Sequence, residues 1–384
     1  MAVDRLLPDD DAAELVGLVG EIAREQLAPR AAAAEEAGEF PAGAFALLGD
    51  AGVLGLPYAE EWGGSNQPYE TYLQALEEIA AAWMSVGVGV SVHVMTCFAT
   101  AHYGTPAQQA AFLPAMVGGE TLGAYALSEA QAGSDISGIA TVAKRGADGY
   151  AISGAKAWIS HAGHADFYTL FARTDPHPTR GISCFLVPAD APGLSFGAPE
   201  KKMGLTGSPT AAVYLDAVPV DEDRRIGAEG EGMRIALHAL DHGRLGIAAC
   251  ATGLAQAALD CAVTYAQQRS QFGRTIGEFQ GLQFLLAEMA AAVDTARASY
   301  LYAARKRDRG MPFTREAAVA KLTATDLAMK VTVDAVQVLG GYGYTRDFPA
   351  ERYLREAKVT QIFEGTNQIQ RLVIARQLLG AAAR

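Results

Sequence analysis

Apolar residues recur every three or four positions near the start of the chain. An aspartate-rich segment that can cap a helix precedes four apolar residues at this spacing, Leu15, Leu18, Val19 and Ile22. Alanine-rich segments with helical spacing follow at 68–82 and 106–117. The pattern predicts an N-terminal α-helical domain over residues 1–118.

Between residues 119 and 228 the pattern changes to short runs in which apolar and polar residues partly alternate. Four of these runs read GYAISGAKAWIS, DFYTLFART, GISCFLVPA and TAAVYLDAVPV. The first begins at the turn pair Asp148-Gly149, which is typical of a hairpin. This part of the chain is therefore predicted to be a small antiparallel β-domain of a barrel-like kind.

Helical spacing returns over residues 229–384. Long alanine-rich segments cover 231–269, 278–309 and 314–339, and a basic cluster before Gly310 marks the end of the second. Three long helices and a shorter last one predict a C-terminal four-helix bundle. The fold class is accordingly α+β multidomain, with helical, β and helical domains in that order.

The composition is that of a globular protein, because half of the residues are hydrophobic and 19% are charged. The formal net charge of −12, without a run of lysine and arginine, argues against a nucleic-acid partner. The N-terminus lacks a basic segment followed by a long apolar run, and no stretch of about 18 apolar residues is uninterrupted. Neither a signal peptide nor a membrane span is expected.

Four cysteines are widely spaced and form no CxxC pair, namely Cys97, Cys184, Cys250 and Cys261. This usage is typical of reduced core thiols, and it favours a cytoplasmic location.

Several familiar site patterns are missing from the chain. It has neither a GxGxxG that joins a strand to a helix nor a GxxxxGK[ST] loop. His161 and His164 form a short HxxH group near Asp166, but no third cluster supports a metal, and none is predicted. Ser128 and Ser134 lie outside any GxSxG sequence, so structural or ligand-contact roles are expected for them.

One carboxylate near the C-terminus is a candidate base. Glu364, in QIFEGTNQIQR, lies between an Ile-Phe pair and Gly365. Glycine can leave a helix with positive φ, and Thr366 or Asn367 can cap the next helix. Glu364 is thus predicted at a corner between two helices, close to apolar side chains that would raise its pKa. The alternative is an ordinary solvated glutamate.

The segment YALSEAQAGSD, residues 125–135, is a second candidate. It starts like a strand and continues into a loop of small residues. Exposed amides and hydroxyls in such a loop can contact a polar ring or a phosphate. A plain surface loop is the alternative.

Three segments together resemble the acyl-CoA dehydrogenase family of flavoenzymes. YALSEAQAGSD resembles its first flavin signature, KAWISHAG its tryptophan-containing flavin strand, and GGYGYTRDFPAERYLREAKVTQIFEGTNQIQR its C-terminal signature. The resemblance extends over nearly the whole chain. KVTQIFEGTNQIQR looks most like the short/medium-chain, butyryl-CoA-type branch, whereas the helix position near Gly243, where other members can carry the base, is not acidic.

The resemblance implies a reaction and an acyl-CoA site. Glu364 would remove the α-proton of the thioester while the β-hydrogen passes as hydride to flavin N5, which gives a trans-2-enoyl-CoA. The backbone N–H of the glutamate and a flavin hydroxyl would hold the carbonyl oxygen. The implied substrate contacts are Ser134, Asp241, Arg244, Phe363 and Gly365. For Arg244, a surface salt bridge is the alternative.

The resemblance also implies an FAD site shared between subunits. One set of contacts comprises Tyr125, Leu127, Ser128, Gly133, Ser134, Trp158, Ile159, Ser160, Thr366 and Gln368. A neighbouring subunit would add the equivalents of Arg269, Phe272, Gln280, Gln337, Val338, Leu339, Gly340 and Gly341. A homo-oligomer, commonly a tetramer in this family, is expected, with an electron-transfer flavoprotein as the electron acceptor.

Three positions depart from the commonest family pattern, namely Gln131, Thr206 and Phe363. None of these changes removes a catalytic group, but they bear on the shape of the acyl pocket. Two other functions use the same fold: an acyl-CoA oxidase or other flavin enzyme that reduces oxygen, and a catalytically silent acyl-CoA-binding scaffold. The presence of Glu364 argues against flavin monooxygenase relatives, which often lack the base.

Overall fold

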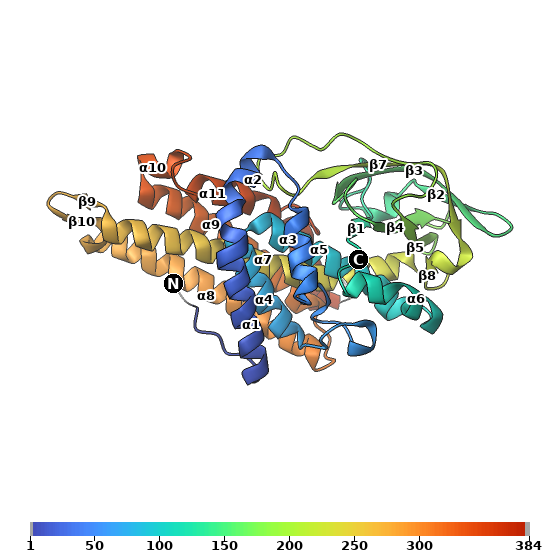
Figure 1. The fold of residues 1–384 in the computed structure, drawn as a ribbon, viewed down its shortest axis with the longest axis horizontal. Helices are drawn as coiled ribbons and strands as arrows, with labels where there is room; N and C mark the ends of the chain where they lie inside the picture. Colours follow the sequence, from blue (N-terminus) through green and yellow to red (C-terminus); the bar gives the residue numbers. More distant parts are fainter. Residues whose placement is uncertain (1–2, 381–384) are drawn as a thin grey trace.

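The first part of the chain is helical, as predicted. The computed structural model describes residues 3–380 (Figure 1). Its N-terminal helices are α1 (Asp10–Ile22), α2 (Ala28–Ala37), α3 (Ala42–Asp50), α4 (Tyr69–Ala82), α5 (Met84–Tyr103) and α6 (Pro106–Val117), with a π-helical segment η1 (Ala23–Leu27) between α1 and α2. Asp9 caps α1 by accepting a hydrogen bond from the Ala12 N–H at 2.8 Å.

The buried face of α1 differs slightly from the apolar spacing in the sequence. Val16 and Val19 are buried against the rest of the helical part, whereas Leu18 is 54% exposed. Ala12 and Ala23 complete the buried face. Helix α1 packs closely on α4, and such a contact buries alanine as well as larger side chains.

Helix α5 forms the centre of the helical core and is apolar on all sides. Every residue in its most apolar window is buried, and so are 78% of those in the corresponding window of α7 (Gly232–Gln268). Both helices are long and apolar enough to cross a bilayer by length and composition. Their burial inside the protein is typical of core helices.

The central part is one sheet built from β1 (Gly123–Ala126), β2 (Val142–Arg145), β3 (Gly149–Ser160), β4 (Phe167–Arg173), β5 (Ile182–Pro188), β6 (Leu194–Phe196), β7 (Thr210–Asp221) and β8 (Arg225–Ile226). The strand order is β6-β7-β3-β2-β4-β5-β8, and β1 pairs with β4. Most pairs are antiparallel, but β1 and β2 run parallel to β4. The sheet is therefore mixed and not wholly antiparallel: β5, which follows β4 along the chain, pairs with it in the antiparallel direction, whereas β1 and β2 are joined to β4 by longer connections and run parallel to it.

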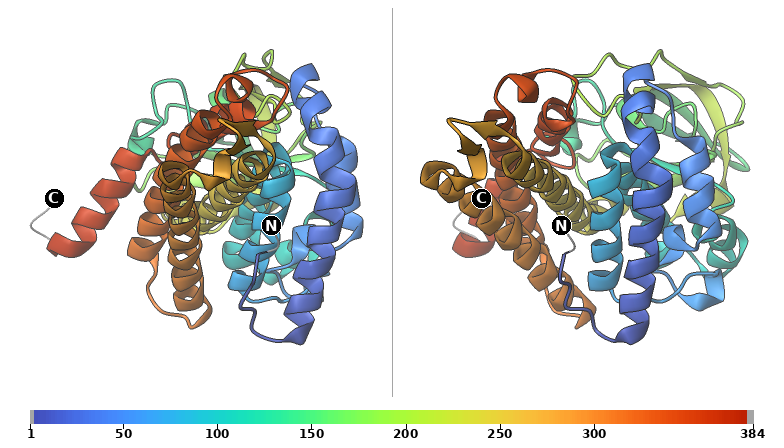
Figure 2. Two further views of the ribbon diagram at one scale, coloured as in Figure 1. Left: turned by 90° about the vertical axis from the view of Figure 1, so that its left-hand side faces the viewer. Right: turned by 60° about the vertical axis from the view of Figure 1, so that its left-hand side comes forward.

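The last part contains three long helices and three short ones. After α7 come a small hairpin, β9 (Ser270–Gln271) and β10 (Arg274–Thr275), and then α8 (Gln280–Asp308), α9 (Thr314–Leu339), α10 (Gly341–Tyr344), α11 (Ala350–Thr360) and α12 (Asn367–Leu379). Helices α7, α8 and α9 pack on one another, and α7 and α8 also pack on α4, while α11 and α12 pack on α9. Figure 2 shows the long C-terminal helices running beside the N-terminal ones. The predicted helical, β and helical order is confirmed.

Candidate active site

Glu364 lies at a corner between α11 and α12. Its own φ is +49° and that of Gly365 is +86°. Positive φ is uncommon for a residue with a side chain, so the surrounding structure must hold this backbone in place. Thr366 begins the next helix, because its hydroxyl accepts a hydrogen bond from the Ile369 N–H at 3.3 Å. The predicted corner is confirmed, with Thr366 and not Asn367 as the cap.

The Glu364 carboxylate is buried, so this residue is not a solvated surface glutamate. Within residues 3–380, neither of its oxygens has a hydrogen-bond partner. Burial raises the pKa of the carboxyl from 4.5 to about 7, and the charges of Lys321 and Arg244 partly oppose this shift. A carboxylate with this pKa and no donor to satisfy it is suited to accept a proton near neutral pH.

Helix α7 provides the space for that carboxylate at Gly243. A Cβ on this glycine would collide with Oε2 of Glu364 and would lie 2.6 Å from Sδ of Met95. Glycine therefore allows the base to approach the helix backbone closely. Met95, on α5, and Gly243 were not predicted to shape the site around the base; the sequence shows only that residue 243 is not acidic.

The next charged residue of α7 forms a buried ion pair. Arg244 Nη1 lies 2.6 Å from Oδ1 of Asp241, and the Thr314 hydroxyl donates to Oδ2 of Asp241 at 2.6 Å. The Arg244 side chain is only 5% exposed, so the alternative of a surface salt bridge is wrong. Its Nη2 lies 4.0 Å from the Cβ position of Gly365, which brings two predicted substrate contacts together.

A lysine that was absent from the predicted site supports the corner from α9. Lys321 Nζ donates to the Gly365 carbonyl and to Oδ1 of Asn367, each at 2.9 Å. Gln370 Nε2 also donates to the Gly365 carbonyl, at 2.9 Å. One signal in the sequence was available: Lys321 lies on the same helical stripe as Ala317, Ala320 and Ala324, where a charged side chain is unexpected.

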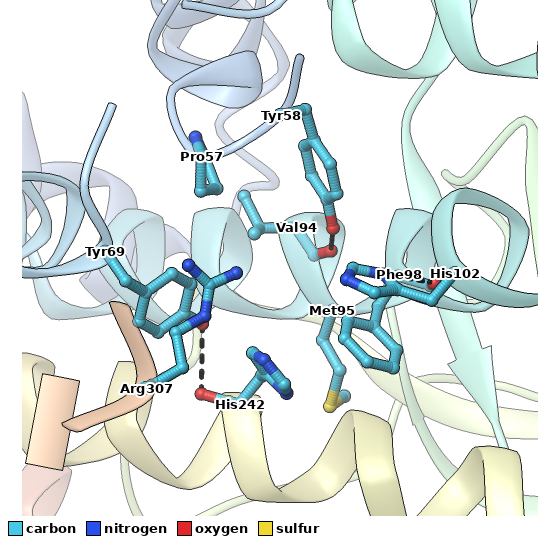
Figure 3. Close-up of a pocket in the computed structure, with 9 residues that line it drawn as sticks. All are labelled: Pro57, Tyr58, Tyr69, Val94, Met95, Phe98, His102, His242 and Arg307. Atoms are coloured by element: carbon cyan, nitrogen blue, oxygen red, sulfur yellow. Dashed lines mark hydrogen bonds between the residues drawn. The ribbon is translucent and has the colours of Figure 1, made fainter. Parts of the chain in front are cut away.

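A small cavity of about 10 Å³ lies close to the base. Met95 and Glu364 both lie against Gly243. Met95 also forms part of the cavity wall, together with Tyr69, His242 and Arg307 (Figure 3). The Tyr69 hydroxyl donates to the His242 carbonyl at 3.1 Å, and this bond fixes one side of the cavity.

The two predicted flavin motifs of the β-domain are tied together by a buried ion pair that was not predicted. Lys156, in the tryptophan-containing motif, lies 2.8 Å from the carboxylate of Glu129, in the first motif. Burial alone would raise the pKa of Glu129, but the Lys156 charge and the hydrogen bonds around the carboxylate lower it to about 2. The same lysine donates to the Leu127 carbonyl at 3.1 Å, so it fixes the loop that follows β1.

The predicted flavin contacts in these motifs differ in exposure. Trp158 is 61% exposed with φ +63°, at a register shift between β3 and β7, while Ile159 is buried beside it. The first motif includes buried Leu127, half-buried Tyr125 and Ser128, and exposed Gly133 and Ser134. Ser160 and Thr366 are half-buried, and Gln368 is exposed.

The second set of predicted FAD contacts lies elsewhere. Arg269, Phe272 and Gln280 flank or form the β9–β10 hairpin, which lies at the opposite end of the long axis from the sheet (Figure 1). Phe272, at the hairpin turn, is 93% exposed. At the end of α9, Gln337, Gly340 and Gly341 are exposed, but the side chains of Val338 and Leu339 are buried in the core. The latter two can offer only backbone groups to a ligand.

The residues that depart from the family pattern have local partners. Gln131 Nε2 donates to Glu129 at 2.7 Å, and the Thr206 hydroxyl donates to the Glu35 carboxylate at 2.8 Å. Phe363 is half-buried and packs against the helical core. The His164 ring stacks on Phe40, and the His161 ring meets Phe40 edge-on.

Three family models match successive parts of the chain. They are "Acyl-CoA dehydrogenase, N-terminal domain" over residues 9–120, "Acyl-CoA dehydrogenase, middle domain" over residues 124–218, and "Acyl-CoA dehydrogenase, C-terminal domain" over residues 230–379. Together they cover most of the described chain.

Individual proteins agree with these matches. The mitochondrial short-chain specific acyl-CoA dehydrogenase of Bos taurus is 42% identical over 94% of this chain and 88% of its own length. The butyryl-CoA dehydrogenase structure from Megasphaera elsdenii superposes with a TM-score of 0.96 at 39% identity, over 98% of this chain and 100% of that one. A chain in a structure of the electron transferring flavoprotein of Acidaminococcus fermentans also gives 0.96, at 40% identity and the same coverage. The chain therefore belongs to the acyl-CoA dehydrogenase family of flavin-dependent oxidoreductases.

Proposed function

We propose that this protein is an FAD-dependent acyl-CoA dehydrogenase in which Glu364 removes the α-proton of the thioester and a trans-2-enoyl-CoA is formed. The observation that carries the proposal is the Glu364 carboxylate itself, which is buried, lacks a hydrogen-bond partner and has a pKa raised to about 7. A base of that pKa exists in appreciable amount as carboxylate at neutral pH. A carboxylate that already accepted hydrogen bonds would have to lose one of them before it could take the proton.

The backbone of the same residue supports the developing negative charge. Within residues 3–380 the Glu364 N–H donates to no other group, so it is free to hold the thioester carbonyl oxygen. A donor of this kind typically contributes about 3 kcal/mol to the stability of such a transition state.

The residues predicted to hold FAD are consistent with such a ligand. Trp158 presents an exposed ring beside the loop that Lys156 fixes, and Phe272 is almost completely exposed at the hairpin turn. FAD, when bound, supplies the acceptor for the hydride that leaves the β-carbon.

The separation of the two contact sets supports an oligomer. The sheet and the β9–β10 hairpin lie at opposite ends of the long axis (Figure 1), so one cofactor can meet both only if two chains contribute. We therefore propose a homo-oligomer, a tetramer by family resemblance, in which FAD lies between subunits.

A short acyl chain suits the space next to the base. The cavity that Met95 lines measures about 10 Å³, which is roughly enough for one water molecule. Met95 lines this cavity and also lies against Gly243 beside the base, which supports a small acyl group there. The name of the short-chain relative from Bos taurus agrees with this proposal.

We further propose that an electron-transfer flavoprotein accepts the electrons and that the protein acts in the cytoplasm. The similarity to a chain in the Acidaminococcus fermentans structure supports the first proposal, and the free state of Cys97, Cys184, Cys250 and Cys261 supports the second. An oxidase that uses oxygen and a silent acyl-CoA-binding scaffold are the competing functions.

The test mixes purified holoenzyme anaerobically with butyryl-, octanoyl- or palmitoyl-CoA and follows bleaching of the flavin band and formation of the enoyl-CoA by mass spectrometry. We expect butyryl-CoA to bleach the flavin fastest and to yield its 2-enoyl product. A scaffold would leave the flavin yellow with every acyl-CoA. An oxidase would be revealed if the reduced enzyme reacted with oxygen faster than with an electron-transfer flavoprotein.

A further inference from the structure

Lys321 is a fully buried cation in the middle of α9. Its residue exposure is 0%, and burial lowers its pKa to about 7, although the neighbouring Glu364 charge opposes that shift. Placing an ammonium group in such a site costs several kcal/mol, and apolar residues often replace buried charges without loss of stability. The position is therefore unusual for a purely structural residue.

The hydrogen bonds of Lys321 are directed at the backbone next to the base. Nζ donates to the Gly365 carbonyl at 2.9 Å and to Oδ1 of Asn367 at 2.9 Å. The Asn367 side chain is itself held in place, because Nδ2 donates to Thr325 at 2.9 Å and to Asp326 at 2.7 Å, and a rotation of the amide would break both hydrogen bonds. Lys321 thus binds the corner at two points, Gly365 directly after the base and Asn367 at the start of α12.

The charge of Lys321 also acts on the base itself. The titratable groups that face Glu364 come from every neighbouring element: Lys321 from α9, Arg244 and Cys250 from α7, Tyr69 and Tyr72 from α4, and Tyr125 from β1. Burial and the Glu364 charge raise the pKa of the cysteine and of the three tyrosines. Only Lys321 and Arg244 among these are cations, and both favour the carboxylate. Arg244 is already neutralised by Asp241 at 2.6 Å, whereas Lys321 is bound to neutral oxygen atoms.

We propose that Lys321 is a positioning residue for the reaction of Glu364, which holds the positive-φ corner in shape and keeps the base ionised. This inference rests on the proposed function. Lys321 binds the Gly365 carbonyl and the Asn367 side chain, which flank the base, so its effect on turnover passes through Glu364.

The test uses two variants of Lys321 in the FAD-loaded enzyme. Lys321→Gln keeps a hydrogen-bond donor but removes the charge, and Lys321→Met removes both. The other lysine of α9, Lys330, is a matched control, because it is half-exposed and bonded to Glu288 and Asp334 on the surface. The measurement is the rate of anaerobic flavin bleaching by butyryl-CoA as a function of pH.

We expect Lys321→Gln to shift the rising limb of the pH profile upward by about one unit, which corresponds to roughly tenfold slower bleaching below the limb. Lys321→Met should show the same shift and, in addition, a lower plateau at high pH, because the corner is no longer held. Lys330→Met should match the wild type. If Lys321→Met does not fold, the shift in Lys321→Gln still decides the question.

The proposal is wrong if the profiles of Lys321→Gln and wild type superimpose, or if Lys330→Met shifts as far. If the wild type bleaches normally and its profile superimposes on that of Lys321→Gln, the role of Lys321 is removed and the proposed function stands. A wild-type enzyme that no acyl-CoA bleaches would overturn the proposed function instead.

Discussion

The carboxylate of Glu364 lies in the space that a Cβ on Gly243 would occupy. Helix α7 and the corner between α11 and α12 therefore meet at a point where only a glycine lets the base reach its place. The Met95 sulfur closes the same point from α5, at 2.6 Å from that Cβ position.

Gly243→Ala is expected to displace the base. Misplacement of a reacting group by about 1 Å can cost about 100-fold in rate, and we expect a loss of that order in flavin bleaching by butyryl-CoA. The control is Gly17→Ala on α1, where a Cβ would meet open space. Equal bleaching rates in Gly243→Ala and wild type would show that the close approach has no catalytic meaning.

The pH dependence follows from the raised pKa of Glu364. Because burial moves this pKa from 4.5 to about 7, kcat/KM should rise with pH through about 7 as the carboxylate forms. The folded protein holds the Glu364 proton more tightly than the unfolded chain does. The contribution of this group to stability is therefore fully present below pH 4.5 and is lost as the pH rises to about 7. A kcat/KM that falls with pH around neutrality would contradict this assignment.

The ion pair between Glu129 and Lys156 gives a prediction about stability. Lys156→Met leaves a buried carboxylate without its cation, and breaking such a pair typically costs about 3 kcal/mol. Urea unfolding should show this loss, together with lower FAD content, and the double variant with Glu129→Gln should recover part of it. Lys144→Met on β2, where the lysine is exposed, is the control. A free energy of unfolding unchanged to within about 0.5 kcal/mol would show that the pair is dispensable.

Phe272→Ala tests the proposed cofactor site between subunits. The Phe272 side chain is 93% exposed and contributes little to the packing of its own chain. We expect FAD to bind about tenfold more weakly, as for removal of a buried aromatic contact, while the melting temperature of the apoprotein stays the same. Leu6→Ala, at another exposed apolar residue, should leave FAD binding unchanged. Normal FAD affinity in Phe272→Ala would place the cofactor within one chain.

Local signals in the sequence were enough to predict several features of the fold and site. Asp9 and Thr105 cap helices whose starts were foreseen, and Gly365 marked the corner at Glu364. Helix α5 has no such signal, because it is buried on nearly every side and its valines alternate from 86 to 94, a spacing that favours a strand.

Features that depend on distant partners were not predictable. The parallel pairing of β1 with β4 joins strands that are separated by forty residues, and nothing in either strand specifies its direction. Lys156 and Lys321 find their partners only in the folded chain, so the sequence could show at most that a lysine interrupts an apolar pattern.

The most direct measurement is the rate of anaerobic flavin bleaching by butyryl-CoA in Glu364→Gln, which keeps the size of the side chain but cannot accept the proton. Glu36→Gln, at a side chain that is 74% exposed, is the control. We predict a loss of about 10²- to 10⁴-fold in Glu364→Gln, with FAD content and butyryl-CoA binding retained, and no loss in Glu36→Gln. Bleaching of Glu364→Gln at the wild-type rate would show that another group is the base.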